Sequence, residues 1–349
     1  MLHILRNKKH KFANQVRRLT TKPSISPKPK VSCLDLHNSG LSAVERLCLE
    51  EALLRHDPLE RSWVIVGMHE PTHHTYLRIP KDEDATRNDS CIIIMGIGGK
   101  PEQLLDVEKV KNDDVLTIKR FSGGGTVVVD HSSLWTTFIG RTQHFPHVSP
   151  FPRSIMEWSA TDIFDRVFER MKVDASEGQQ RRSLVMDTKS CGLSQDNGET
   201  LEYDSKKSSG LPSLRGVDFS LRENDYVLGE RKMGGNAQSI TGDSWMHHTS
   251  FLWDYEDENM QYLTLPNKRP DYRGDRSHDD FLVKLKTIYG NSGDERSSKH
   301  AFLNHVKSVS CDAFDLEEVS FADALSVVDD LGGMQAWFDG KCRTKIIDL

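Results

Sequence analysis

The sequence lacks any apolar run long enough to cross a membrane as a helix. Its longest runs are short, such as Cys91–Met95, whereas a membrane helix needs about 20 apolar residues. No repeat with a period of about 20 to 50 residues is visible, which excludes a solenoid. The chain has 349 residues. We therefore expect one or two domains and no membrane partner.

Acidic residues are absent from the first 34 positions, which carry nine Lys or Arg residues. The net charge is −6, so residues 35–349 carry −15. A basic, acid-free start with scattered apolar residues is typical of a mitochondrial transit peptide. We predict that residues 1–34 are a disordered transit peptide and that the protein works in the mitochondrial matrix. The alternative is a disordered basic arm that binds nucleic acid or a membrane, although we expect neither as a partner.

Cysteine pairs at metal-binding spacing are also missing. None of the six cysteines forms a Cys-x-x-Cys pair, and none stands near a histidine at metal spacing. His69, His73 and His74 cluster, but Pro71 prevents a helical His-Glu-x-x-His site there. The cluster is therefore interpreted as a solvated loop. Free thiols in a reducing compartment fit this pattern.

Apolar periodicity predicts short strands mixed with a few helices. Ser42–Glu45 reads as a capping box that opens a helix. Since no strand–helix–strand rhythm is visible, we predict an α+β fold. Strands are expected near residues 62–66, 91–95, 115–119, 126–129, 134–139, 226–228 and 248–252, and helices near 101–110, 160–171, 281–288 and 299–337.

One polar stretch interrupts this pattern. Residues 174–216 are rich in Ser, Gly and charged residues and contain one aromatic residue, Tyr203. Such a composition cannot bury enough apolar surface to order itself, so a disordered insertion is expected. We predict a catalytic domain over residues 35–290 that contains this insertion, followed by a small helical C-terminal segment over residues 291–349.

A glycine-rich segment between two predicted strands is the first candidate site. It contains Ser122, Gly123, Gly124 and Gly125, and Arg120 precedes them. Glycines allow a sharp turn, and consecutive N–H groups in a turn can bind an anion. An arginine fork suits a phosphate or a carboxylate. The segment does not match a Walker A loop, and taken alone it could be a tight hairpin turn.

Two further segments carry candidate residues. Lys232 stands beside a glycine pair, and a lysine ammonium is a compact charge that can bridge a carboxylate and a phosphate. An ordinary surface lysine is the alternative. His247 and His248 precede an apolar strand, where a structural histidine is the default interpretation.

Taken together, these segments resemble one family. Arg120–Val127, Arg222–Asp225, Gly229–Ala237 and His247-His248, in this order, resemble the lipoate–protein ligase A family of the biotin/lipoate ligase superfamily. The resemblance implies a central, mostly antiparallel sheet flanked by helices, as in class II synthetase cores. It also implies ATP-dependent activation of lipoate or octanoate to an acyl-adenylate. The acyl group then passes to a lysine of a lipoyl carrier domain, such as the 2-oxoacid dehydrogenase E2 subunits or the glycine cleavage H protein.

The resemblance also implies roles for individual residues. Lys232 is the catalytic residue, which contacts the acyl carboxyl group and the α-phosphate. Asp225 assists, through a magnesium ion. The residues implied to bind ATP or the acyl chain, besides Asp225, are Arg120, Ser122, Gly123, Gly124, Gly125, Thr126, Val127, Val128, Asn236, Ala237 and His248.

The sequence departs from the family pattern after the glycines. The family continues with His-Asp-x-Gly-Asn, whereas this chain has Val129-Asp130-His131-Ser132-Ser133. Two alternatives therefore stay open: an octanoyltransferase that uses acyl carrier protein, and a catalytically weak protein that binds lipoyl domains. No cysteine lies between Cys191 and Cys311, which argues against a thioester route near Lys232.

Overall fold

The computed structural model describes residues 27–69, 74–78, 88–176, 218–265, 269–290 and 295–349. The helices in these ranges are α2 (Ala43–His56), α3 (Pro101–Leu104), α4 (Val107–Asn112), α5 (Pro152–Trp158), α7 (His278–Phe281), α8 (Lys286–Tyr289), α9 (Glu295–Ala313), α10 (Phe321–Asp329) and α11 (Met334–Asp339). A π-helical segment, Ser159–Phe164, continues α5 into helical residues 165–176. Among the described residues, no helix combines the length and apolar character that crossing a membrane requires.

The described strands form two sheets. The larger has the order β11-β1-β2-β6-β10-β9-β8-β7, and the smaller has the order β12-β4-β3-β5. In the larger sheet only β1 pairs in parallel, with both of its neighbours, which confirms the predicted α+β class with a mostly antiparallel central sheet. The bounds are β1 (Lys30–Asp35), β2 (Trp63–Met68), β3 (Asn88–Met95), β4 (Val115–Lys119), β5 (Val127–Asp130), β6 (Ser133–Arg141), β7 (Phe219–Arg222), β8 (Asp225–Leu228), β9 (Arg231–Thr241), β10 (Ser244–Leu252), β11 (Asp315–Glu318) and β12 (Lys345–Ile346).

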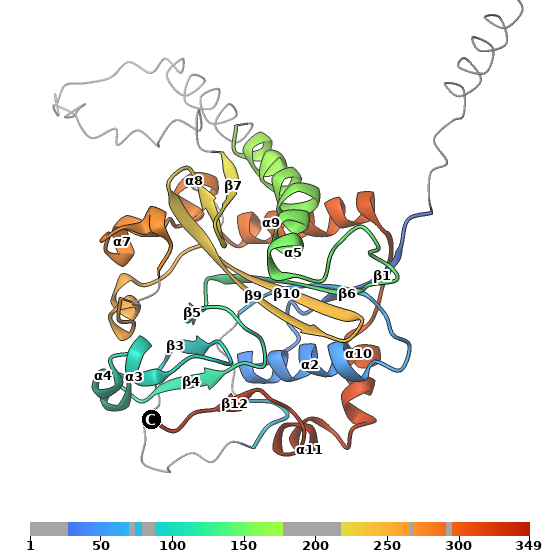
Figure 1. Cartoon of the computed structure of the whole chain (residues 1–349), viewed down its shortest axis with the longest axis horizontal. Coiled ribbons are helices and arrows are strands. Elements are labelled where there is room, and N and C mark those ends of the chain that lie inside the picture. Colours follow the sequence, from blue (N-terminus) through green and yellow to red (C-terminus); the bar gives the residue numbers. More distant parts are fainter. Residues whose placement is uncertain (1–26, 70–73, 79–87, 177–217, 266–268, 291–294) are drawn as a thin grey trace, which may run out of the picture.

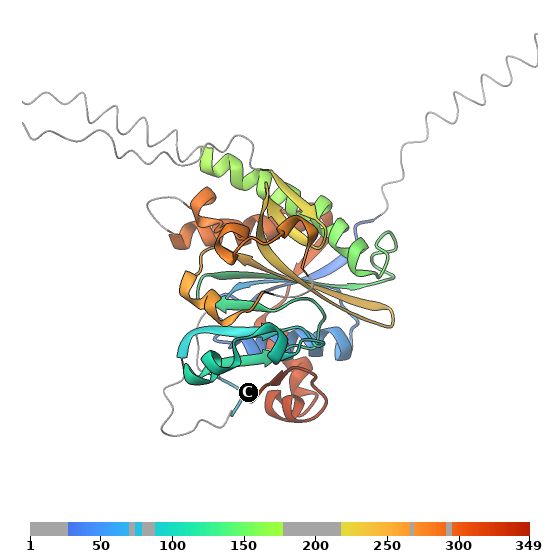
Figure 2. The ribbon, with the colours of Figure 1, turned by 60° about the vertical axis from the view of Figure 1, so that its left-hand side comes forward.

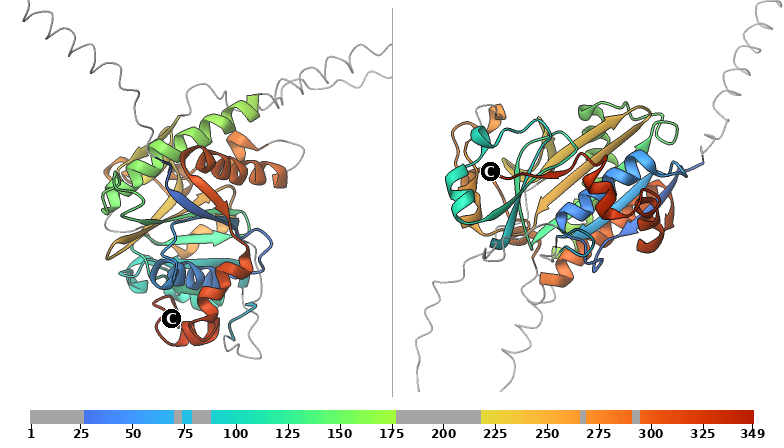
Figure 3. Two further views of the ribbon diagram at one scale, coloured as in Figure 1. Left: turned by 90° about the vertical axis from the view of Figure 1, so that its right-hand side faces the viewer. Right: turned by 90° about the horizontal axis from the view of Figure 1, so that it is seen from below.

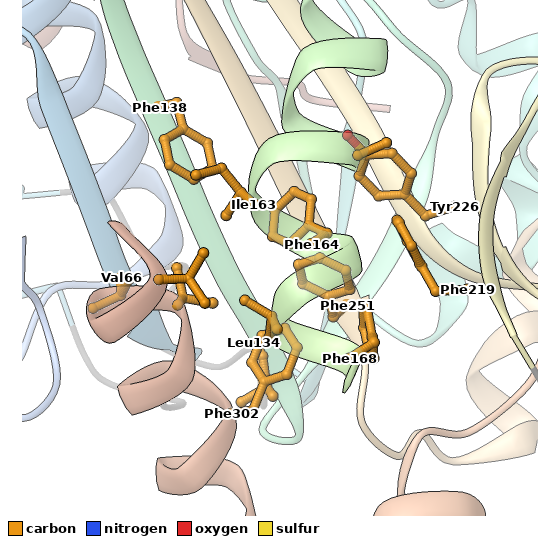
Figure 4. Packing of buried hydrophobic residues seen from close by; sticks show 14 of the residues in the cluster. Val66, Leu134, Phe138, Ile163, Phe164, Phe168, Phe219, Tyr226, Phe251 and Phe302 are labelled. Carbon is orange, nitrogen blue, oxygen red and sulfur yellow. The ribbon is translucent and has the colours of Figure 1, made fainter. Parts of the chain in front are cut away.

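Helices cover one face of the larger sheet, and a helix layer with the smaller sheet covers the other. Figure 1 shows α5, its continuation and α9 on one face, and α2 with the smaller sheet on the opposite face; Figure 2 shows the same layers from another side. The first face is rich in aromatic rings: Phe164 packs against Phe251 with ring centroids 5.0 Å apart (Figure 4). Each ring buried in this way stabilises the fold by about 1.5–3 kcal/mol.

Helix α2 begins with the predicted capping box. The Ser42 hydroxyl accepts a hydrogen bond from the Glu45 backbone N–H, and the Ser42 N–H donates to the Glu45 carboxylate at 2.9 Å. The helix is buried on nearly all sides, because the sheet covers one face and α10 and α11 cover the other. Trp337 of α11 donates a hydrogen bond to the carbonyl of Cys48, in the middle of α2.

The predicted N-terminal boundary at residue 34 is wrong. Residues 30–34 form most of β1, which lies between β2 and β11 in the larger sheet. Val31, Cys33 and Leu34 are buried, so this short apolar run belongs to the core. Residues 1–26 of the predicted transit peptide lie outside the described residues.

The C-terminal residues form helices α9, α10 and α11 and also contribute one strand to each sheet. Strand β11 pairs with β1 at the edge of the larger sheet, and β12 pairs with β4 in the smaller sheet (Figure 3). The sequence does not reveal β11, because Asp315–Glu318 is acidic and largely exposed. Its structure depends on backbone pairing with β1.

Three further predictions need correction. The helix expected at 101–110 is divided into α3 and α4, because Asp106 caps α4 through the Lys109 N–H. The helix expected at 281–288 is two short helices, α7 and α8. Of the predicted disordered insertion, residues 174–176 end a helix, and residues 177–216 lie outside the described residues.

Candidate active site

The glycine-rich segment forms a loop between β4 and β5 that lies against β9. The Gly123 N–H donates to the Gln238 carbonyl at 2.8 Å. Gly124 has a φ of +109°, and a Cβ there would lie 2.6 Å from the carbonyl oxygen of Asn236. Both the backbone conformation and the close approach to β9 therefore require glycine at position 124.

Arg120 stabilises this loop from inside. Its guanidinium group donates to the carbonyls of Ile94, Gly123 and Gly125 at 2.8–3.1 Å, and to the Ser122 hydroxyl. Burial lowers the pKa of Arg120 to about 10. The predicted direct contact between Arg120 and a phosphate or carboxylate is therefore not the geometry observed. The side chain instead satisfies carbonyl groups that the sharp turn would leave unpaired.

The other side of the loop is open. A Cβ at Gly125 would meet no atom within 4 Å. The neighbouring Thr126 hydroxyl is buried and, in the described part of the chain, has no hydrogen-bond partner. An open loop with an unpaired hydroxyl beside it can accept an anionic or polar ligand group.

The valines after the loop divide between two cores. Val127 approaches β9 so closely that a Cβ at Gly235 would lie 2.8 Å from its Cγ1. Val128 points to the other face of β5, into the core of the smaller sheet. Val127 therefore remains the candidate for an acyl-chain contact, and the predicted role of Val128 is not supported by its position.

Lys232 and Asp225 form an ion pair on adjacent strands. The Lys232 Nζ lies 2.7 Å from Asp225 Oδ1, and their side chains are 24% and 8% exposed. Tyr272 donates from its hydroxyl group to the second carboxylate oxygen, Asp225 Oδ2, at 2.9 Å. The lysine is thus held by a largely buried carboxylate that is itself held by a tyrosine.

Residues that the sequence did not single out support this ion pair. The N–H of Val283 donates to the carbonyl of Lys232 at 2.9 Å. Arg276 donates to the carbonyls of Glu230 and Tyr272, which joins the 269–283 segment to the β8–β9 hairpin. The segment has no apolar periodicity in the sequence. Its distinguishing feature there is the density of basic and aromatic side chains after Pro270.

The predicted magnesium ligand, Asp225, has both of its oxygens engaged by neighbouring side chains. Both carboxylate oxygens of Asp225 already accept hydrogen bonds, one of them from an ammonium group. Among the described residues, no group of three His, Cys, Asp or Glu side chains is placed to hold a metal ion. A magnesium ion at Asp225 would share these oxygens with Lys232 and Tyr272, so a magnesium site there stays a prediction.

Both histidines of the His-His pair are buried and bonded. His247 contacts the Tyr226 hydroxyl at 3.0 Å, and burial together with the neighbouring His248 lowers the pKa of His247 to about 3. The Nδ1 atom of His248 lies 2.9 Å from both the Thr137 hydroxyl and the Glu50 carboxylate. Since Ala237 pairs directly with His248, both residues face the α2 side of the sheet.

The structure therefore brings most of the predicted residues together around β9. Asn236 accepts a hydrogen bond from the Thr249 hydroxyl, and its own amide donates to the carbonyl of Asn224, beside Asp225. The glycine loop touches the same strand at Gln238. Lys232 is the second residue of this strand and the loop contacts its middle, so one strand carries both halves of the candidate site.

His69 differs from its prediction as part of a solvated loop. It is buried at the end of β2, where its ring stacks on Trp135 with centroids 5.8 Å apart. Burial, with contributions from Arg46 and His131, lowers its pKa to about 4. The neighbouring residues 70–73 lie outside the described residues.

One strand of the mostly antiparallel sheet carries both Lys232 and the contact to the glycine loop, and such a sheet is the fold that the resemblance to lipoate–protein ligases implies. The chain belongs to the lipoyl protein ligase A/B catalytic domain family, whose model matches residues 85–307. This family includes the one that the sequence motifs resemble.

Individual proteins are also similar to this chain. The inactive lipoate–protein ligase 2 of Plasmodium falciparum is 25% identical over 221 residues, which are 59% of this chain. The chain spans about half the length of that relative (50%). A candidate lipoate protein ligase of Thermoplasma acidophilum, solved with bound lipoic acid, shares the fold with a TM-score of 0.52 at 13% identity, over 86% of this chain and 94% of its own. A bipartite lipoate protein ligase of the same organism, described with its E2 lipoyl domain, gives a TM-score of 0.49 at 14% identity, over 88% and 92%.

Proposed function

We propose that this protein is an ATP-dependent lipoate–protein ligase. It would activate lipoate or octanoate as the acyl-adenylate and transfer the acyl group to a lysine of a lipoyl carrier domain. The observation that carries the proposal is the position of Lys232. Lys232 lies on β9, the strand that contacts the open glycine loop, and Asp225 on the adjacent strand β8 fixes its ammonium group. The lipoic acid bound to the Thermoplasma relative supports the choice of acid.

The proposed chemistry suits these residues. A carboxylate oxygen of the acid attacks the α-phosphorus of ATP, the bond to the bridging oxygen breaks, and pyrophosphate leaves with the electron pair. A carrier lysine amine then attacks the acyl carbonyl and AMP leaves. The first step brings two anions together, so a fixed cation such as Lys232 stabilises the transition state more than the ground state.

An octanoyltransferase that takes its acyl group from acyl carrier protein is the first alternative, and one of its two possible routes needs a cysteine nucleophile. Burial raises the pKa of Cys33 to about 12 and that of Cys48 well above its usual value, so neither thiol forms a thiolate readily. Cys91 and Cys342 are also buried, and Cys311 is exposed on helix α9, outside the strands that carry the candidate site. Activity that requires ATP and survives replacement of all six cysteines by Ser or Ala would favour the ligase.

A weak or inactive protein that binds lipoyl domains is the second alternative. Val129, which stands where the family has histidine, is buried in the core beneath the larger sheet and offers no polar group. The related Plasmodium protein is named inactive. Binding of a lipoyl domain without ATP consumption would favour this alternative.

The partners and the compartment are also proposals. The carriers would be E2 subunits of 2-oxoacid dehydrogenases or the glycine cleavage H protein. Import into the mitochondrial matrix would depend on the basic segment before β1. A reporter fused to residues 1–29 should enter mitochondria, and a reporter that stays in the cytosol would contradict this targeting.

One experiment tests the proposed function directly. The full chain is incubated with ATP, magnesium, lipoate or octanoate and a lipoyl domain. Pyrophosphate release is measured, and the lipoyl domain is weighed by mass spectrometry. We expect the domain to gain one acyl group in an ATP-dependent manner. If acyl transfer proceeds from acyl carrier protein without ATP, while free acid plus ATP gives nothing, the transferase replaces the ligase.

A further inference from the structure

The orientation of the Lys232 ammonium group depends on its neighbours. An ammonium group carries three N–H donors in a tetrahedral arrangement. Asp225 Oδ1, at 2.7 Å, takes one of them, and the side chain is 24% exposed. With one donor fixed, the other two have set directions. In the proposed reaction two acceptors need them, the acyl carboxylate and the α-phosphate.

Asp225 can direct the ammonium group only if its own carboxylate is held. The carboxylate is 8% exposed, and the Tyr272 hydroxyl donates to its second oxygen at 2.9 Å. Burial and the charge of Asp225 raise the pKa of Tyr272, so the hydroxyl stays protonated and remains a donor. Rotation of the carboxylate about its Cβ–Cγ bond would break both contacts at once.

Tyr272 is itself held from several sides. The Arg222 guanidinium lies over its ring, 4.6 Å from the centroid. Arg276 donates to its backbone carbonyl at 2.6 Å, and the Tyr272 N–H donates to the Glu223 carboxylate. The phenol is therefore positioned by contacts to both ends of the β7–β8 hairpin turn and to its own segment.

We propose that Tyr272 is a positioning residue for the reaction, which acts through Asp225 to aim the two free N–H donors of Lys232 at the substrate anions. This inference rests on the proposed function and deepens it. The cation in the glycine loop, Arg120, is occupied by carbonyl groups and so cannot take over the contacts of Lys232 with the substrate anions.

The test uses a matched pair of tyrosines. Tyr262 also donates from its hydroxyl to one aspartate oxygen, Asp113 Oδ2, at 2.9 Å, but it lies against the smaller sheet. Tyr272→Phe and Tyr262→Phe therefore remove the same kind of hydrogen bond. We expect Tyr272→Phe to lower kcat for adenylate formation by about 10-fold, with KM for the acid changed by less than about 3-fold. Tyr262→Phe should leave both near the wild-type values.

A double-mutant cycle separates positioning from a general loss of structure. Tyr272→Phe should have little further effect in an Asp225→Asn background, because the tyrosine acts through that carboxylate. Additive effects, or equal effects of the two tyrosine variants, would overturn the proposal.

A second readout does not need turnover. Calorimetry measures the binding of a non-hydrolysable sulfamate analogue of the acyl-adenylate to the same four proteins of the cycle. If the wild type makes no adenylate but its analogue binding shows the Tyr272–Asp225 coupling, the proposed function fails and the positioning role stands. If the wild type turns over without that coupling in kcat or in binding, the positioning role fails and the ligase stands. If the wild type neither turns over nor binds the analogue, both the ligase function and the positioning role of Tyr272 fail.

Discussion

The Nδ1 atom of His248 lies 2.9 Å from the Glu50 carboxylate, which joins the centre of the larger sheet to helix α2. Both side chains are buried, and the second Glu50 oxygen accepts from Arg46 and from the Thr137 hydroxyl. Burial alone would raise the pKa of Glu50, but His248 and Arg46 outweigh it and lower the pKa to about 2. A charged network thus lies directly beneath β10, one residue from the structural histidine His247.

The Glu50 network should make the protein sensitive to acid. Because its pKa is lower in the folded protein than the usual 4.5, Glu50 stabilises the fold above about pH 4.5 and loses this contribution as the pH falls toward 2. Glu50→Gln should cost about 3 kcal/mol at pH 7, since it leaves Arg46 without its carboxylate. The difference in unfolding free energy between the wild type and the variant should shrink between pH 4.5 and 2. A difference that does not depend on pH would contradict this assignment.

His69 should make the stability of the fold depend on pH in a higher range than Glu50 does. Its folded pKa of about 4 lies below the usual 6.5, so the unfolded chain binds the proton more readily and stability falls as the pH drops from 6.5 to 4. His69→Phe keeps a ring on Trp135 but cannot be protonated. Between pH 7 and 4.5, the melting temperature of the variant should fall less than that of the wild type. Equal losses in the two proteins would show that His69 stays neutral, or accessible, in both states.

The glycine loop offers a neighbouring pair of substitutions. At Gly124, alanine would adopt an unfavourable positive φ, and its Cβ would lie 2.6 Å from the Asn236 carbonyl and 2.8 Å from Arg120 Nη2. We expect Gly124→Ala to lower stability by about 2–4 kcal/mol and to abolish adenylate formation. Gly125→Ala should be tolerated in stability measurements, because its Cβ meets no atom within 4 Å. Denaturant unfolding measures the stability of both variants. Equal stabilities would show that the loop rearranges to accept a side chain at position 124.

Lys232→Ala should lower both the rate of adenylate formation and, to a smaller extent, the stability of the fold. Losing a fixed cation at the reacting centre typically costs about 100- to 1000-fold in rate. The variant should also lose about 1–2 kcal/mol of stability, because Asp225 stays largely buried and keeps only Tyr272 as a partner. Lys232→Arg should restore part of the stability but not the activity, because a planar guanidinium cannot occupy the same place. Near-normal activity in either variant would move the catalytic role to another residue.

The fold class and the motif residues could be predicted from the sequence, because each depends on a local signal. The Ser42–Glu45 capping box and the strands around Ile93 and Phe138 have such signals in their own residues. Strand β9 has no such local signal, because Lys232–Asn236 contains glycines and polar residues that are typical of a loop. Its extended backbone depends on β8 and β10 on either side.

The candidate site was predicted at the level of residues but not of contacts. The sequence indicates that Arg120 and Lys232 matter, yet it cannot show which charges they meet. Arg120 meets carbonyl oxygens of its own loop, and Lys232 meets an aspartate of the preceding strand. Tyr272 was missed altogether, because its partner lies 47 positions earlier and no periodic pattern connects them.

The pairing of β1 with β11 has a consequence for synthesis of the chain. Strand β1 is among the first described elements to leave the ribosome, and β11 follows about 280 residues later. Until then the outer backbone edge of β1 stays unpaired, and an open edge invites pairing with other chains. We expect nascent chains that stop before residue 315 to aggregate more than chains that include β11. Strand β11, near the end of the sequence, therefore protects the edge of β1 from pairing with strands of other chains.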